Sequence, residues 1–113
     1  RDPNAWPPEV WQALRTLYDL SGAGMAAQET VPTALALVRL ADGDPVTATL
    51  LAANLGGDGD TIGAIAGAIS GAYRGLEAFP TEWLAQLAEV NGLDFSALAA
   101  RYVAAMRQMT PAV

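Results

Sequence analysis

Four glycines recur at intervals of four residues, at Gly63, Gly67, Gly71 and Gly75. Positions i and i+4 lie on the same face of an α-helix, so this spacing gives one helix a stripe with almost no side chain. Each glycine in a helix interior costs about 0.5 to 1 kcal/mol relative to alanine, so the surroundings must compensate. We predict that neighbouring backbone packs closely into the stripe and aims the start of this helix at an element with further site residues.

The other apolar residues also recur at helical spacing, and the chain has no alternating strand pattern, so we expect an all-α fold. Trp11 and Trp83 lie on apolar helical stripes, where we expect them to anchor the core. Prolines, glycines and capping residues divide the chain into six expected helices. These are Pro7-Pro8 to Ser21, Gln28 to Leu40, Pro45 (capped by Asp44) to Leu55, Thr61 to Arg74, Pro80 to Asn91-Gly92, and Asp94 or Ser96 to Pro111.

The composition excludes several kinds of chemistry. The 113 residues include no Cys and no His, so the chain itself has no disulfide, no thiolate nucleophile and no imidazole base or metal ligand. With 6 basic and 12 acidic residues the net charge is −6, which argues against a nucleic-acid or anionic-membrane surface. The weakly polar stretch 61–73 is too short to span a bilayer, and we expect a soluble, cytoplasmic protein that begins at Arg1 as a processed or partial product.

A cluster of oxygen-bearing side chains precedes the striped helix, in the segment Gly56-Gly57-Asp58-Gly59-Asp60-Thr61. Asp58, Asp60 and Thr61 could turn toward one point and offer the hard oxygen ligands that Mg²⁺, Mn²⁺ or Ca²⁺ prefer. The alternative is purely structural: Asp60 is the N-cap of the helix and Asp58 is a turn residue. Spacing alone favours the structural alternative.

This segment, together with Glu29-Thr30-Val31-Pro32-Thr33-Ala34, closely resembles the C-terminal part of the ADP-ribosylglycohydrolase family. That family includes the dinitrogenase reductase-activating glycohydrolase. The likeness runs from about Gly22 to Leu93, and a G-G-D-x-D-T loop opening a glycine-striped helix is the specific part of it. We therefore interpret residues 1–113 as the C-terminal portion of a single all-α domain, a compact helical array of this family's type.

The resemblance implies a hydrolase that cleaves a glycosidic bond of an ADP-ribosyl or related ribosyl group at a site with two Mg²⁺ or Mn²⁺ ions. By position, the metal ligands would be Asp58, Asp60 and Thr61, and Asp60 would bridge the ions as the catalytic residue. The loop at Gly22 and Gly24 matches one that lines the substrate cleft in relatives. The substrate would be an ADP-ribosylated protein or a ribosyl small molecule, with no nucleic-acid or membrane partner.

The sequence departs from the family pattern in two places. Gly59 stands where many members have Thr or Ser, which removes a hydroxyl without removing a ligand. The family's N-terminal Thr-Asp-Asp run has no counterpart in the chain, and Glu9, Asp19 and Glu29 are isolated acids. We therefore expect the chain alone to be inactive, and its partner to be the missing N-terminal portion. The alternatives are a non-catalytic helical interaction module, crystallin-like or degenerate, and a nucleoside or ribosyl hydrolase of the same family.

Overall fold

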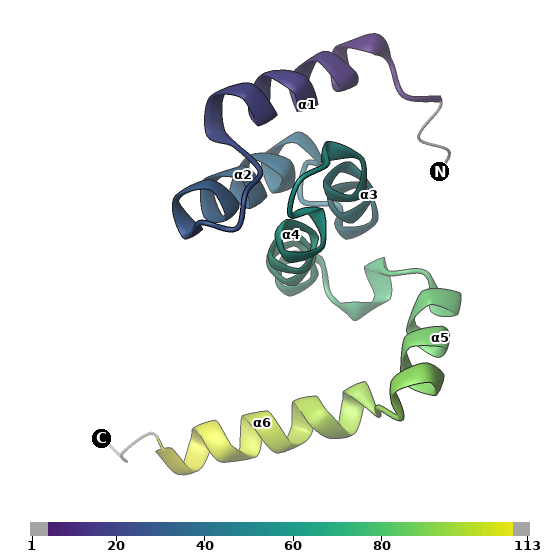
Figure 1. Cartoon of the computed structure of the whole chain (residues 1–113). Coiled ribbons are helices and arrows are strands. Elements are labelled where there is room, and N and C mark those ends of the chain that lie inside the picture. Colours follow the sequence, from purple (N-terminus) through teal and green to yellow (C-terminus); the bar gives the residue numbers. More distant parts are fainter. Residues whose placement is uncertain (1–4, 110–113) are drawn as a thin grey trace. The chain divides into compact units, whose positions relative to one another are not determined.

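The structure is a computed structural model of the chain and describes residues 5–109 (Figure 1). The predicted all-α fold is confirmed, because residues 5–109 form helices and no strand. Proline stands at the first position of α1 and of α3, where its missing N–H costs nothing. The helices are α1 (Pro8–Ser21), α2 (Ala27–Leu40), α3 (Pro45–Leu55), α4 (Gly59–Arg74), the short 3₁₀ helix η2 (Leu76–Ala78), α5 (Thr81–Asn91) and α6 (Phe95–Met109).

The chain divides into two compact units, Arg1–Phe79 and Pro80–Val113. The first contains α1 to α4 and η2, and the second contains α5 and α6. The assignment of residues 1–113 to a single domain stays a prediction. Since every predicted site residue lies before Phe79, only the first unit concerns the site.

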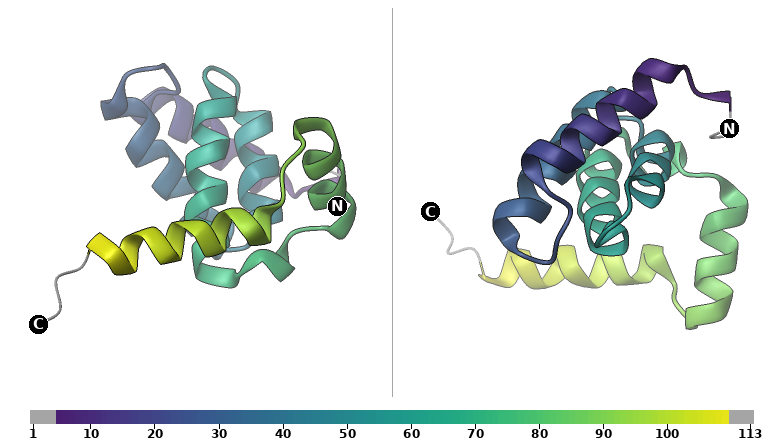
Figure 2. Two further views of the ribbon diagram at one scale, coloured as in Figure 1. Left: turned by 90° about the horizontal axis from the view of Figure 1, so that it is seen from below. Right: turned by 45° about the horizontal axis from the view of Figure 1, so that its top comes forward.

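The core of the first unit lies between α2, α3 and α4, and α3 lies beside α4 along its length (Figures 1 and 2). Burying one Leu or Ile side chain completely is worth about 1.5 to 3 kcal/mol. Alanines fill the places where the helices approach most closely. The innermost side chains are Ala34, Leu37, Ala48, Leu51, Ala52, Ile62 and Ala66.

The close packing predicted for the glycine stripe of α4 is confirmed, but the atoms nearest to it belong to side chains and not to neighbouring backbone. A Cβ added at Gly63 would lie 3.3 Å from the Cβ of Ala52, and one at Gly67 would lie 3.0 Å from Cγ2 of Thr49; both neighbours are on α3. A Cβ at Gly71 would lie 3.0 Å from the Phe79 ring. The helices α3 and α4 can therefore lie this close together only because Gly63 and Gly67 carry no side chain.

Gly75, the fourth member of the spacing, lies outside the helix. It follows the last residue of α4, Arg74, and adopts a φ of +89° with its N–H bonded to the Gly71 carbonyl oxygen. Glycine at this position is explained by the left-handed backbone, not by packing.

The predicted caps of α3 and α6 are confirmed. The Asp44 carboxylate accepts a hydrogen bond from the Thr47 N–H at 2.9 Å. Asp94, rather than Ser96, caps α6, because its Oδ1 accepts from the Ala97 N–H at 2.9 Å. Each side chain satisfies an N–H that the first helical turn leaves without a backbone partner.

The expectation that Trp11 anchors the core is wrong. Leu14 carries the buried face of α1, whereas Trp11 is 38% exposed and tilts against the Trp6 ring with centroids 5.6 Å apart. Trp83 is half-buried and also lies outside the core.

In the second unit, Gly92 ends α5 in the left-handed conformation, with φ of +62°, as a glycine C-cap. None of the side chains of α5 and α6 falls in the buried class. Across the part of the chain that the structure describes, no helix combines the length and apolar character needed to cross a membrane.

Candidate functional site

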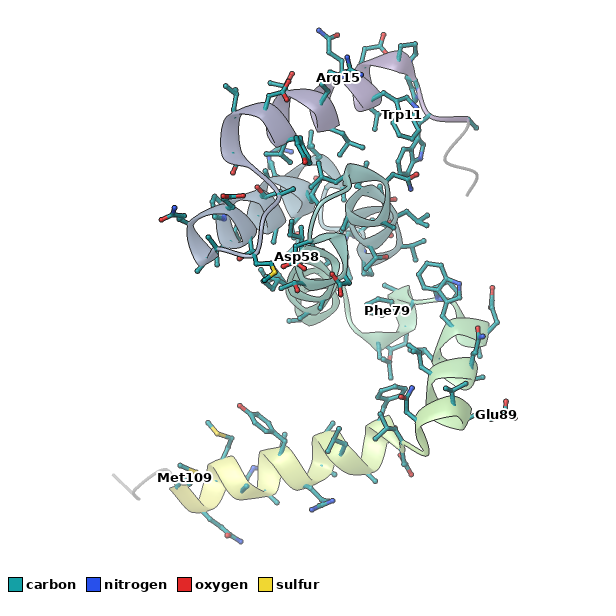
Figure 3. The ribbon with its side chains drawn as sticks, viewed as in Figure 1. Trp11, Arg15, Asp58, Phe79, Glu89 and Met109 are labelled. Atoms are coloured by element: carbon teal, nitrogen blue, oxygen red, sulfur yellow. The ribbon has the colours of Figure 1, made fainter. Side chains whose placement is uncertain are left out.

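The loop between α3 and α4 is built on two consecutive glycines with positive φ, Gly56 at +90° and Gly57 at +63°. Only glycine adopts this backbone without strain, and the pair turns the chain back on itself. Asp58 follows directly and stands just before α4, where Figure 3 labels it. The turn made by these two glycines thus places the Asp58 carboxylate at the start of α4.

Asp58, Asp60 and Thr61 gather within the first turn of α4. The Thr61 hydroxyl donates a hydrogen bond to Oδ1 of Asp58 at 3.1 Å. Hydrogen bonding from the Thr61 backbone, then with the Asp58 side chain, holds the pKa of the Asp60 carboxyl below its ordinary value. The structure therefore brings together two carboxyl groups and a hydroxyl, one carboxyl being biased toward its ionised form.

The capping alternative for Asp60 is wrong. α4 begins at Gly59, two residues earlier than predicted, so Asp58 takes the capping position and Asp60 lies inside the first turn. Asp58 makes no side-chain cap hydrogen bond to the backbone of the helix. Neither carboxylate is therefore accounted for by the usual role of an N-cap side chain.

The loop between α1 and α2 lies against this helix start. The carbonyl oxygen of Ala23 accepts a hydrogen bond from the Asp58 N–H at 2.7 Å. A Cβ at Gly57 would overlap the same carbonyl group, so the two loops meet in direct backbone contact. Gly22 and Gly24, the residues expected to line the substrate cleft, are thereby placed beside Asp58.

A surface hollow of about 460 Å³ opens between these two loops. Half of its lining residues are glycine or alanine, and two of the others carry carboxylates. It is lined by Tyr18, Gly22, Ala23, Gly24, Met25, Glu29, Gly57 and Asp58. A hollow of this kind can admit an extended polar ligand beside the acidic residues.

Glu29 lines the hollow, although the sequence analysis gave it no role in the site beyond its place in the segment that resembles the family. It stands in the first turn of α2, and its Oε2 accepts a hydrogen bond from the Gly24 N–H at 2.6 Å. Its carboxylate therefore contacts the very loop that carries Gly22 and Gly24. The available signal was an acid in the first helical turn, five residues after a glycine loop.

Within residues 5–109 no group of three or more acidic, His or Cys side chains could hold a metal ion. Asp58, Asp60 and Thr61 supply two carboxylates and one hydroxyl, whereas Mg²⁺ is octahedral and needs six oxygen atoms in all. Water, a substrate or other protein groups would have to provide the remaining ligands.

Comparisons with known proteins give consistent matches. The family model described as ADP-ribosylglycohydrolase matches residues 1–112. The uncharacterized protein YegU of Escherichia coli (strain K12) is 48% identical over 104 residues, which cover 89% of this chain and 30% of YegU. ADP-ribosylhydrolase ARH3 of Bos taurus is 44% identical over 72 residues, covering 55% of this chain and 20% of that protein.

The human ARH3 is 43% identical, with the same coverage. The chain thus spans between 20% and 30% of the length of these relatives. No solved structure matches the chain significantly.

Proposed function

The chain belongs to the ADP-ribosylglycohydrolase family, and from this premise we propose that it is the C-terminal part of a metal-dependent hydrolase. The bond cleaved is the glycosidic bond of an ADP-ribosyl or related ribosyl group. The relatives named ADP-ribosylhydrolase support this substrate class. The observation that carries the proposal is the joining of Asp58, Asp60 and Thr61 in one helical turn beside the Gly22–Gly24 loop.

The donor atoms of this turn fit a hard divalent cation. Carboxylate and hydroxyl oxygens are the ligands that Mg²⁺ and Mn²⁺ prefer. The Asp60 carboxyl is ionised at neutral pH, as an aspartate ordinarily is, and its lowered pKa extends the ionised form to more acidic pH, so a metal ion need not displace a proton from it. The Thr61 hydroxyl donates a hydrogen bond to Oδ1 of Asp58, which leaves its oxygen lone pairs able to act as a ligand. Asp58, Asp60 and Thr61 would therefore hold the ions.

Bound ions of this kind supply Lewis-acid stabilisation of developing negative charge and orient the attacking water and the ribose hydroxyls. The chain's own contribution is positional. Asp60 would hold the ions and act as the catalytic carboxylate, Asp58 is fixed by its backbone bond to Ala23, and Gly22 and Gly24 would line the wall of the substrate cleft.

We further propose that the chain supplies half of the two-metal site and is inactive by itself. Three oxygen side chains are too few to hold two divalent ions. The remaining ligands would come from an N-terminal portion, consistent with the greater length of the relatives.

The test is reconstitution of the chain with that N-terminal portion, followed by calorimetric titration of Mg²⁺ or Mn²⁺ and assay of hydrolysis. We expect Asp58→Asn and Asp60→Asn each to weaken metal binding by at least about tenfold and to abolish turnover. Asp19→Asn is the matched control, since Asp19 is exposed on α1 and its substitution changes the charge by the same amount.

Unchanged binding and hydrolysis in Asp60→Asn would refute the proposed site. A reconstituted protein that binds no metal and turns over nothing would favour the non-catalytic interaction module instead. Turnover measured on ADP-ribosyl-arginine, ADP-ribosyl-serine and simple nucleosides would separate the proposed substrate class from a nucleoside hydrolase.

A further inference from the structure

Two side chains of α2 hold the loop between α1 and α2, one on each side of Ala23. Before Ala23, the buried Thr33 hydroxyl lies 2.8 Å from the Gly22 carbonyl oxygen and 2.8 Å from the Ser21 hydroxyl. After Ala23, the Glu29 carboxylate accepts from the Gly24 N–H at 2.6 Å. The carbonyl group of Ala23 is therefore fixed from both sides by one rigid helix.

The loop is shaped around the Glu29 carboxylate. A Cβ at Gly22 would lie 2.5 Å from Oε2 of Glu29, and a Cβ at Gly24 would lie 2.6 Å from the same atom. A side chain at either position would displace the Glu29 carboxylate from where it now lies, so both glycines leave the space that the carboxylate fills. A bond from a backbone N–H to an ionised carboxylate is also about twice as strong as a neutral one.

The fixed carbonyl group then orients the metal-binding turn. Ala23 accepts the Asp58 N–H at 2.7 Å, and Gly57 packs directly on Ala23. Hydrogen bonds and the loop backbone thus connect Glu29, through Gly24 and Ala23, to the backbone of Asp58. Asp58 in turn accepts the Thr61 hydroxyl at 3.1 Å.

We propose that Glu29 is a positioning residue of the metal site, acting through the Gly22–Gly24 loop on Asp58. The inference rests on the proposed function, because it concerns the ions that Asp58 would hold. Glu29 does not touch the ions in this role. It fixes the direction from which the Asp58 carboxylate is presented, as residues that hold a metal ligand in place commonly do.

Two substitutions separate the length of the side chain from its charge. Glu29→Gln keeps the length and an acceptor oxygen, so it should retain the bond to the Gly24 N–H. Glu29→Asp keeps the charge but is one methylene shorter and should lose that bond. Glu89→Gln is the control, since Glu89 is an exposed acid on α5, and Figure 3 labels it.

The first readout is the rate of amide hydrogen exchange, measured by ¹⁵N NMR on the metal-free chain. We expect Glu29→Asp to speed exchange of the Asp58 N–H by about tenfold, the loss of roughly one hydrogen bond, without changing the core amides of Leu37 and Ile62. Glu29→Gln should stay within about threefold of the unsubstituted chain, and Glu89→Gln should have no effect. The second readout is Mn²⁺ affinity of the reconstituted protein, which Glu29→Asp should lower by about 10- to 100-fold and Glu29→Gln should largely preserve.

The inference is overturned if Glu29→Asp leaves the Asp58 N–H unchanged, if it speeds exchange of the core amides equally, or if Glu29→Gln is as damaging as Glu29→Asp. Failure of the proposed function looks different. In that case Asp58→Asn and Asp60→Asn leave Mn²⁺ binding intact, while the metal-free exchange of the Asp58 N–H still decides whether Glu29 orients the turn.

Discussion

The Asp58 N–H donates a 2.7 Å hydrogen bond to the carbonyl oxygen of Ala23, across 35 residues of sequence. This bond joins the loop that follows α1 to the turn that begins α4. It places the acidic turn against the Gly22–Gly24 loop, so that the proposed metal ligands and the proposed substrate wall lie side by side.

Gly57 should be more sensitive to substitution than its backbone conformation alone implies. Gly57→Ala introduces both the left-handed cost of about 1 to 2 kcal/mol and an overlap with Ala23, so we expect a loss of stability above about 2 kcal/mol. Gly92→Ala has a similar φ of +62° and no atom within 4 Å, so it should cost only the left-handed term. Chemical denaturation of the two variants measures the difference, and equal costs would show that the Ala23 contact does not matter.

The glycine stripe should tolerate no large side chain. Gly67→Leu would push against Thr49 of α3, and overpacking of this kind costs about 1 to 3 kcal/mol or more. Ala68→Leu places the same leucine side chain on the exposed face of α4, where changes stay within about 0.5 kcal/mol. Thermal unfolding of both variants is the measurement, and a Gly67→Leu variant as stable as Ala68→Leu would contradict the packing.

Removal of the Ser70 hydroxyl should stabilise the chain. Ser70 is fully buried on α4, and within the described residues its hydroxyl has no hydrogen-bond partner. Burial of an unpaired hydroxyl costs about 1 to 3 kcal/mol, so Ser70→Ala should raise the free energy of unfolding by about 1 kcal/mol.

Thr33→Val is the contrasting change, because the equally buried Thr33 hydroxyl is bonded and its loss should destabilise the chain by a similar amount. Urea denaturation gives both values. A destabilised Ser70→Ala variant would mean that the Ser70 hydroxyl has a role in folding that its environment does not reveal.

Asp60 should titrate at a lower pH than an ordinary aspartate. Its folded-state pKa is depressed, so the stability it contributes is present above the unfolded pKa and is lost as the pH falls through the folded one. The stability difference between the unsubstituted chain and Asp60→Asn should therefore shrink on acidification. Side-chain ¹³C NMR of the metal-free chain reports the titration directly, and a midpoint at or above the ordinary value would contradict the hydrogen bonding described at this turn.

Most of the secondary structure could be predicted because its signals are local. The Pro45 start with its Asp44 cap and the Gly92 stop are short patterns that act within one helical turn. The acidic turn was identified by the same kind of local pattern, supported by its family resemblance. The start of α4 was placed two residues late because Asp60 and Asp58 are equally suitable as caps, and only the positive φ of Gly57 decides which residue flanks the helix.

The position of Trp11 could not be predicted, because an apolar stripe shows which residues can be buried and not how much neighbouring surface exists to cover them. Leu14 took the buried place and Trp11 remained against Trp6. Gly75 is a second example. Its spacing matched the packing stripe, yet the helix ended one residue before it.

The sequence by itself determined the helical fold, the glycine stripe, the acidic turn and the family, because these depend on patterns spanning a few consecutive residues. Only the tertiary structure decided that Glu29 and Thr33 hold the Gly22–Gly24 loop and that Ala23 receives the Asp58 N–H. The bond from Asp58 to Ala23 joins segments 35 residues apart and forms only when the loop before α2 meets the start of α4, whereas Glu29 and Thr33 bond the loop that directly precedes their own helix. The groups bonded in this loop and at Asp58 belong to the backbone, which every residue carries. The side chains at Ala23 and Asp58 therefore could not be used to predict these bonds.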